Sequence, residues 1–100
     1  MKLITDNINR LRELCAIYKV KTLYIFGSIL TDRFNENSDV DLLVNFNSEI
    51  NYQNYTDNYF NFFYALKDLL KRNVDLVDES SVKNKYFRAE LDETKQLIYG

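Results

Sequence analysis

The sequence FGSILTDRFNENSDVDLLV, from Phe26 to Val44, joins an isolated glycine and a serine to two closely spaced aspartates. Gly27 follows the run TLYIF of residues 22–26, whose β-branched and aromatic side chains predict a buried strand. A glycine at a strand end can adopt a positive φ and lets a ligand approach the backbone without meeting a Cβ atom. Amides of a following helical turn, starting near Ser28, can then point at an anion such as phosphate. The same turn also occurs for steric reasons alone.

The aspartates lie in a segment, residues 39–46, that predicts a second strand. Its residues alternate, with Val40, Leu42, Val44 and Phe46 on one face and Asp39, Asp41, Leu43 and Asn45 on the other. Aspartates two positions apart on a strand have α-carbons roughly 6.5 Å apart, so both carboxylates can reach one cation. Oxygen ligands of this kind suit Mg²⁺ or Mn²⁺. A solvated turn is the alternative, but it does not explain why Asp41 lies inside the apolar strand, where a lone buried charge is costly.

The tripeptide VDL occurs twice, at residues 40–42 and 74–76. If the two strands are neighbours in one sheet, Asp75 lies on the carboxylate face beside Asp41. Three acids on one face would repel one another without a cation, so this arrangement predicts a metal site. Asp78 is the competing acid of the later strand, and we interpret it as a cap or a surface charge at the turn DESS.

The remaining chain alternates between helical and extended patterns. We expect a first helix from Thr5, capped by Thr5 or Asp6, with the apolar stripe Ile4, Ile8, Leu11, Cys15 and Tyr18. The longest helix has the stripe Tyr52, Tyr55, Tyr59, Phe62, Phe63, Leu66, Leu69 and Leu70. After the strand at 74–77, a serine-capped final helix should direct Val82, Tyr86, Ala89 and Leu91 inward. Residues 96–100 can close the chain as an edge strand. Together these patterns predict one α/β or α+β domain over residues 1–100, with a small mixed sheet packed against helices.

Composition excludes several classes of function. The chain has no histidine, which removes Ser-His triads and the common zinc sites. The net charge of −2, without a basic block, argues against nucleic acid as the main partner. No apolar run is long enough to span a membrane, and the N-terminal residues lack the pattern of a secretory signal, so we expect a soluble, cytoplasmic protein. The single cysteine, Cys15, lies in an apolar stripe and is interpreted as a core residue.

These motifs resemble the nucleotidyltransferase superfamily that includes DNA polymerase beta. Gly27-Ser28, ten intervening residues, Asp39-Val40-Asp41 and a later strand acid at Asp75 are similar to its signature. With the leading helix and the long central helix, the whole chain resembles minimal nucleotidyltransferase (MNT) antitoxins, which are paired with HEPN-domain toxins.

The resemblance implies a site and a reaction. Gly27 and Ser28 would hold the β and γ phosphates of ATP, Asp39 and Asp41 would bind two Mg²⁺ ions, and Asp75 would complete the site near the attacking hydroxyl. The reaction implied is transfer of AMP from ATP to a tyrosine of a HEPN RNase toxin, which neutralises that toxin. The alternative is a non-catalytic antitoxin that neutralises the HEPN partner by binding and occlusion.

Three further features are left open by the sequence. Relatives often carry arginines directly after the Gly-Ser pair, whereas the first arginine here is Arg33, which can reach the triphosphate or form a surface salt bridge. A second feature is the basic cluster Lys83, Lys85, Arg88 and Lys95, which we interpret as a solvated helix face rather than a binding surface. The third is the pair Phe60 and Tyr64, which fits core packing, or a docking surface if the pair is exposed.

Overall fold

A computed structural model describes all residues, 1–100. The elements in chain order are α1 (Lys2–Asp6), α2 (Ile8–Ile17), β1 (Val20–Phe26), the short 3-10 helix η1 (Gly27–Leu30), β2 (Val40–Phe46), α3 (Tyr55–Leu70), β3 (Val74–Asp78), the 3-10 helix η2 (Glu79–Ser81), α4 (Lys85–Thr94) and β4 (Gln96–Tyr99). The four strands form one sheet in the order β3-β2-β1-β4. β1 is antiparallel to both β2 and β4, whereas β2 and β3 are parallel and are connected through α3. The predicted fold class, a small mixed sheet with helices, is confirmed.

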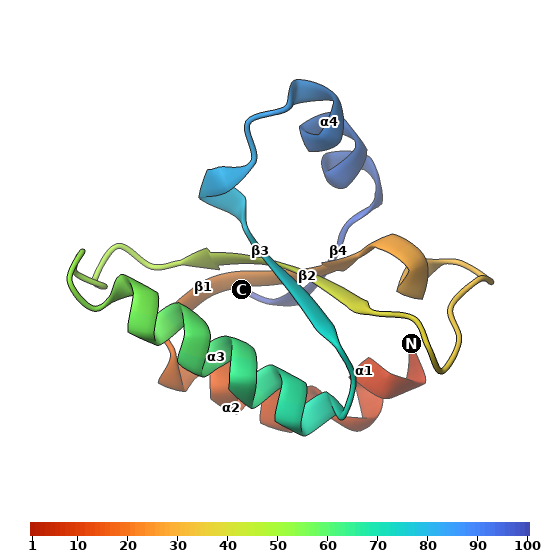
Figure 1. The fold of residues 1–100 in the computed structure, drawn as a ribbon, viewed down its shortest axis with the longest axis horizontal. Helices are drawn as coiled ribbons and strands as arrows, with labels where there is room; N and C mark the ends of the chain where they lie inside the picture. Colours follow the sequence, from red (N-terminus) through yellow and green to blue (C-terminus); the bar gives the residue numbers. More distant parts are fainter.

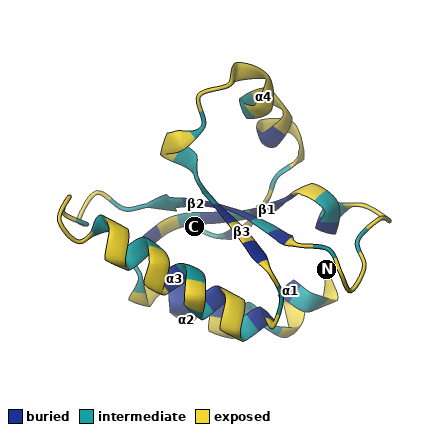
Figure 2. Ribbon diagram, viewed as in Figure 1, coloured by how far each residue is buried: buried dark blue, intermediate teal, exposed yellow.

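The sheet has an extensive apolar face and a second face that is only partly covered. Figure 1 shows α1, α2 and α3 on one side of the sheet and α4 on the other. The side facing α2 and α3 holds a core of 17 buried residues, and Figure 2 shows buried positions gathered where these helices meet the sheet. A separate cluster of Phe26, Leu43 and Leu91 lies under α4. Leu43 therefore shares the carboxylate face, as its alternation predicts, but it is fully buried there.

α3 supplies the largest side chain of the core and determines where β3 begins. Phe62 is fully buried and packs at 5.7 Å from the Tyr18 ring and 6.0 Å from the Phe46 ring, measured between centroids. The helix ends at Leu70, and the left-handed backbone of the next residue, Lys71 (φ 55°), turns the chain toward β3. The predicted stripe is confirmed from Tyr55 onward, but Tyr52 precedes the helix and is 98% exposed.

The predicted first helix is two helices. α1 and α2 meet at Asn7, whose side-chain amide donates a hydrogen bond to the carbonyl of Leu3. The prediction of Thr5 or Asp6 as the cap is wrong, because the Thr5 hydroxyl donates to carbonyls of the preceding turn and no side chain caps α2. The apolar stripe is nevertheless real, and Cys15 is fully buried, with burial raising the pKa of its thiol to about 12. A core role for this cysteine is confirmed.

The C-terminal elements also differ from expectation in detail. The cap of α4 is Asn84, whose side-chain oxygen accepts from the amides of Tyr86 and Phe87, so the predicted serine cap is wrong. Of the four side chains expected inward, Leu91 is buried and Val82 is partly buried, whereas Tyr86 and Ala89 are exposed. α4 covers little of the sheet, so most of its side chains face solvent. The predicted edge strand is confirmed as β4, and no helix of the chain is long and apolar enough to cross a membrane.

We expect Phe62→Ala to lower the free energy of unfolding by about 3 to 5 kcal/mol, because it removes a fully buried ring and leaves a cavity. Urea denaturation measures this change. Asn61→Ala is the matched control on the exposed side of the same helix, with an expected change within about 0.5 kcal/mol. Equal effects of the two substitutions would contradict the assignment of Phe62 to the core.

Candidate active site

The parallel pairing of β2 and β3 brings two of the predicted site residues together. Asp41 and Asp75 are direct register partners, between the pairs Val40–Val74 and Leu42–Leu76. Their apolar flanking residues belong to the core beneath α2 and α3. Because side chains alternate along a strand, both carboxylates point to the opposite face, beside α4. The repeated VDL motif therefore places two acids side by side on one face.

Asp39 completes an acidic group at the start of β2. Asp39 and Asp75 are exposed, while Asp41 between them is partly buried. The pKa of Asp41 is raised above its ordinary value of 3.8, first by burial and then by the charges of Asp75 and Asp39. A hydrogen bond from the backbone amide of Ser28 acts in the opposite direction. Asp75 and Asp39 therefore both disfavour the charged form of Asp41.

Gly27 lies directly against this group. Its φ is +77°, and a Cβ atom added there would be 2.2 Å from Oδ2 of Asp41, a distance that atoms cannot adopt without displacement. The register of β1 with β2 pairs Phe26 with Asp41, which explains why the next residue must be a glycine. The Gly-Ser step and the second aspartate therefore form one structural unit, although twelve residues lie between Ser28 and Asp41 in the sequence.

The donor set fits a divalent cation in its chemistry. All candidate ligands are carboxylate oxygens, which Mg²⁺ prefers. The side chains do not, however, form a closed cluster of three that could hold a metal ion as they stand. The strand positions of Asp39, Asp41 and Asp75 are adjacent as expected, but the predicted convergence of their carboxylates is not reached in this structure. Like charges at this spacing repel one another, and a bound cation would remove that repulsion.

A cleft of about 570 Å³ opens beside Gly27, between η1 and α4. Gly27, Ser28 and Arg33 line it on one side, and Phe87 and Leu91 line it on the other. Arg33 is exposed and takes part in none of the ion pairs of the structure, so the alternative of a surface salt bridge is wrong. All three predicted nucleotide-binding residues therefore share one cleft next to the acids.

The other charged candidates have local roles. Asp78 accepts hydrogen bonds from the amide and hydroxyl of Ser80, which confirms it as a cap of η2. In the basic cluster, Arg88 pairs with Glu79 at 2.9 Å. Lys95 pairs with Asp92 at 2.9 Å and lies over the Tyr24 ring. Lys85 lies 5.5 Å from the centroid of the Tyr86 ring, so three of the four cations make contacts within the fold.

The sequence does not predict two residues that bind the backbone next to the acids. The Tyr59 hydroxyl donates to the carbonyl of Leu76, the residue after Asp75, and burial together with the charge of Asp75 raises the pKa of Tyr59. Arg72 binds the loop that leads to Asp39. Tyr59 is one of many aromatic residues in α3, and Arg72 is one of many surface cations in the sequence, so neither gives a local signal of its position.

Comparison with known proteins defines the family. Residues 9–100 match the family model described as polymerase beta, nucleotidyltransferase. The chain belongs to this nucleotidyltransferase family, and the predicted enzyme class is confirmed. Two relatives from Methanocaldococcus jannaschii, both provisionally named protein adenylyltransferases, support the assignment. One is 41% identical over 85 residues, covering 82% of this chain and 78% of the relative. The other is 36% identical over 90 residues, covering 88% and 84%.

Solved structures share the fold. A provisionally named minimal nucleotidyltransferase superposes with a TM-score of 0.73 and 28% identity, covering 94% of each chain. A toxin-antitoxin structure with AMP-PNP gives a TM-score of 0.72 at 23% identity, covering 94% of this chain and 73% of that one. A complex of tri-AMPylated Shewanella oneidensis HEPN toxin with MNT antitoxin gives 0.66 at 20% identity, covering 96% and 71%. The minimal nucleotidyltransferase architecture is therefore confirmed.

Because the pKa of Asp41 is raised, replacing this acid with a neutral residue should increase the free energy of unfolding at neutral pH. A raised pKa means that folding favours the protonated acid, so this contribution is full below pH 3.8 and is lost as the pH rises through the folded-state pKa. We expect metal-free Asp41→Asn to unfold at higher urea concentration than the wild type at pH 7, with the difference vanishing near pH 3.5. Asp32→Asn, at an exposed loop position, is the control. A variant that is less stable than the wild type at pH 7 would contradict the electrostatic description.

Proposed function

We propose that this protein transfers AMP from ATP to a tyrosine hydroxyl of a HEPN RNase toxin and so neutralises the toxin. The observation that carries the proposal is the pairing of Asp41 with Asp75 against Gly27 and the Ser28 amide. Acids next to a strand end that lacks a Cβ atom support the choice of a phosphate-bearing substrate. The names of the Methanocaldococcus relatives and the tri-AMPylated HEPN toxin in a structure of the same fold support the choice of reaction and partner.

In this proposal the Gly-Ser step binds the phosphates and the acids bind the cations. Gly27 and Ser28 hold the β and γ phosphates, and Arg33 contacts the phosphate chain from its side of the cleft. Asp39, Asp41 and Asp75 would hold two Mg²⁺ ions, which would neutralise the phosphate charge and orient the reacting oxygens. Binding of cations would also relieve the repulsion that raises the pKa of Asp41.

The reaction is an in-line displacement at the α-phosphorus. The tyrosine oxygen of the partner forms a bond to the α-phosphorus, and the bond from that phosphorus to the oxygen bridging the β-phosphate breaks, which releases pyrophosphate. Asp75 accepts the proton of the attacking hydroxyl, because it is the exposed acid of the pair. Asp41 is partly covered and stays directed at the cation sites.

In this proposal the acceptor tyrosine arrives on the HEPN partner. Phe60 is 48% exposed and Tyr64 is 61% exposed on the outer side of α3, so the docking alternative for this pair is open. We propose the cytoplasm as the location, because ATP and the RNA that a HEPN RNase would cleave are there. The buried, unpaired Cys15 agrees with a reducing compartment.

The test is AMP transfer to the purified HEPN partner with ATP and Mg²⁺, followed by mass spectrometry. We expect an AMP adduct with the wild type, and a loss of about 100-fold or more in rate for Asp41→Asn and Asp75→Asn, because each substitution removes an acid of the site. Asp78→Asn is the matched control, since this acid lies three residues beyond Asp75 and caps η2.

Occlusion without catalysis gives the opposite pattern. Asp41→Asn would then still protect cells from the toxin, and no adduct would be found on the partner under conditions where the complex forms. That outcome would replace the proposed function with the binding-only alternative.

A further inference from the structure

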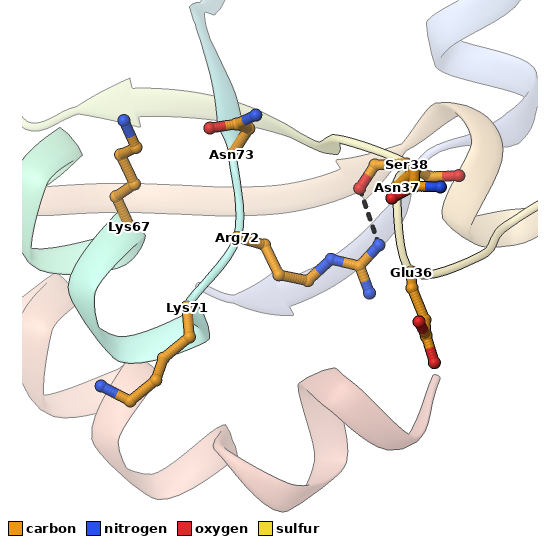
Figure 3. Close-up of a pocket in the computed structure, with 7 residues that line it drawn as sticks. All are labelled: Glu36, Asn37, Ser38, Lys67, Lys71, Arg72 and Asn73. Carbon is orange, nitrogen blue, oxygen red and sulfur yellow. Dashed lines mark hydrogen bonds between the residues drawn. The ribbon is translucent and has the colours of Figure 1, made fainter.

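We infer that Arg72 is a positioning residue that holds Asp39 in place relative to Asp75. This inference rests on the proposed function, because it concerns the acids of that site. Arg72 lies between the end of α3 and the start of β3, three residues before Asp75. Its guanidinium group crosses to the loop that ends at Asp39, as Figure 3 shows.

Arg72 binds this loop through its backbone and through a ring. The Nη2 atom donates hydrogen bonds to the carbonyl of Asn35 and, at 2.7 Å, to the carbonyl of Ser38. The guanidinium carbon also lies 4.3 Å from the centroid of the Phe34 ring, within the range of a cation-π contact. These contacts join positions 34, 35 and 38, so one side chain fixes the course of the loop.

Asp39 is held from both sides by the same short segment. Ser38, the residue before it, is bound by Arg72. Val40, the residue after it, donates its amide at 3.0 Å to the carbonyl of Asn73. Asp39 makes no side-chain hydrogen bond of its own and is exposed. The backbone position of Asp39 therefore depends on the Arg72-Asn73 segment, which leads directly into the strand that carries Asp75.

The Arg72 side chain also has one unsatisfied donor. Its Nε atom is buried without a hydrogen-bond partner, and a buried unsatisfied donor is a cost to folding. The side chain lines a polar pocket of about 460 Å³ together with Lys67, Lys71 and residues of the loop. In Figure 3 the ammonium groups of Lys67 and Lys71 point away from the Arg72 guanidinium. The three positive charges therefore do not converge on one ligand position. Arg72 differs from both lysines because it donates hydrogen bonds to carbonyls of the loop.

The test is Mn²⁺ binding, measured by the electron paramagnetic resonance signal of the free ion in the presence of a non-hydrolysable ATP analogue. We expect Arg72→Lys to weaken Mn²⁺ binding about 10-fold, because groups that orient metal ligands typically contribute 10- to 100-fold in affinity. Lysine retains the charge but cannot reproduce the planar guanidinium contacts. Exchange of the Ser38 amide, which donates to Asn35 at 3.1 Å, should accelerate in the same variant.

Lys67→Ala is the matched control, since Lys67 lines the same pocket without any hydrogen bond to the loop. It should bind Mn²⁺ as the wild type does. Arg72→Lys and Arg72→Met with wild-type Mn²⁺ affinity would overturn the inference, as would an equal loss in Lys67→Ala, which would indicate a general effect of charge. Arg72→Lys serves as the decisive variant if the methionine protein does not fold.

Failure of the proposed function is distinguishable from failure of the inference. If Asp39→Asn and Asp41→Asn leave Mn²⁺ affinity unchanged, the acids do not bind the cation, and the proposed site and the role of Arg72 are both overturned. If those two substitutions abolish binding and Arg72→Lys does not weaken it, only the positioning role is overturned.

Discussion

The parallel pairing of β2 with β3 is the constraint on which the site depends. Parallel neighbours require a long crossover, and α3 provides it while burying Phe62 and its apolar stripe against the sheet. The pairing register places Asp41 opposite Asp75, and a shift by one residue would move every side chain of β3 to the other face. The apolar alternation of both strands opposes such a shift, because Leu42 and Leu76 must face the core. Core packing and the geometry of the acids are thus fixed by the same hydrogen bonds.

Two further contacts complete the arrangement around that pairing. Gly27 allows the end of β1 to lie against Asp41, which no residue with a Cβ atom could do in this backbone conformation. The start of β3 holds the loop before β2 through Arg72 and Asn73. The protein therefore keeps three like charges near one another at the start of β2 and in β3, although the charges repel. Such stored repulsion is typical of a site that is completed by a cation.

Much of this could be predicted from the sequence, and the physical reasons for the exceptions are specific. The strands around Asp41 and Asp75 and most of α3 follow from alternation and helical periodicity, which are local properties. The break at Asn7 and the Asn84 cap were missed because several nearby polar residues can each cap a helix, and local sequence does not select among them. Leu43 lies on the carboxylate face as its alternation predicts, but its burial depends on a distant segment, α4. Arg72 was missed because its partners are backbone carbonyls 34 and 37 residues away in the chain.

The family of the chain gives these contacts a chemical meaning. Its fold is that of minimal nucleotidyltransferases, and the residues that resemble the family signature are those that the structure gathers at one end of β1, β2 and β3. The central claim is that Asp75 acts in the same site as Asp41, beside the Gly-Ser backbone.

Paramagnetic broadening by Mn²⁺ tests this claim most directly. With a non-hydrolysable ATP analogue bound, substoichiometric Mn²⁺ should broaden the backbone amide signals of Ser28, Asp41 and Asp75 together, while that of Ala16 on the far side of the sheet stays sharp. An Asp75 signal that remains as sharp as that of Ala16, while Asp41 is broadened, would contradict the account.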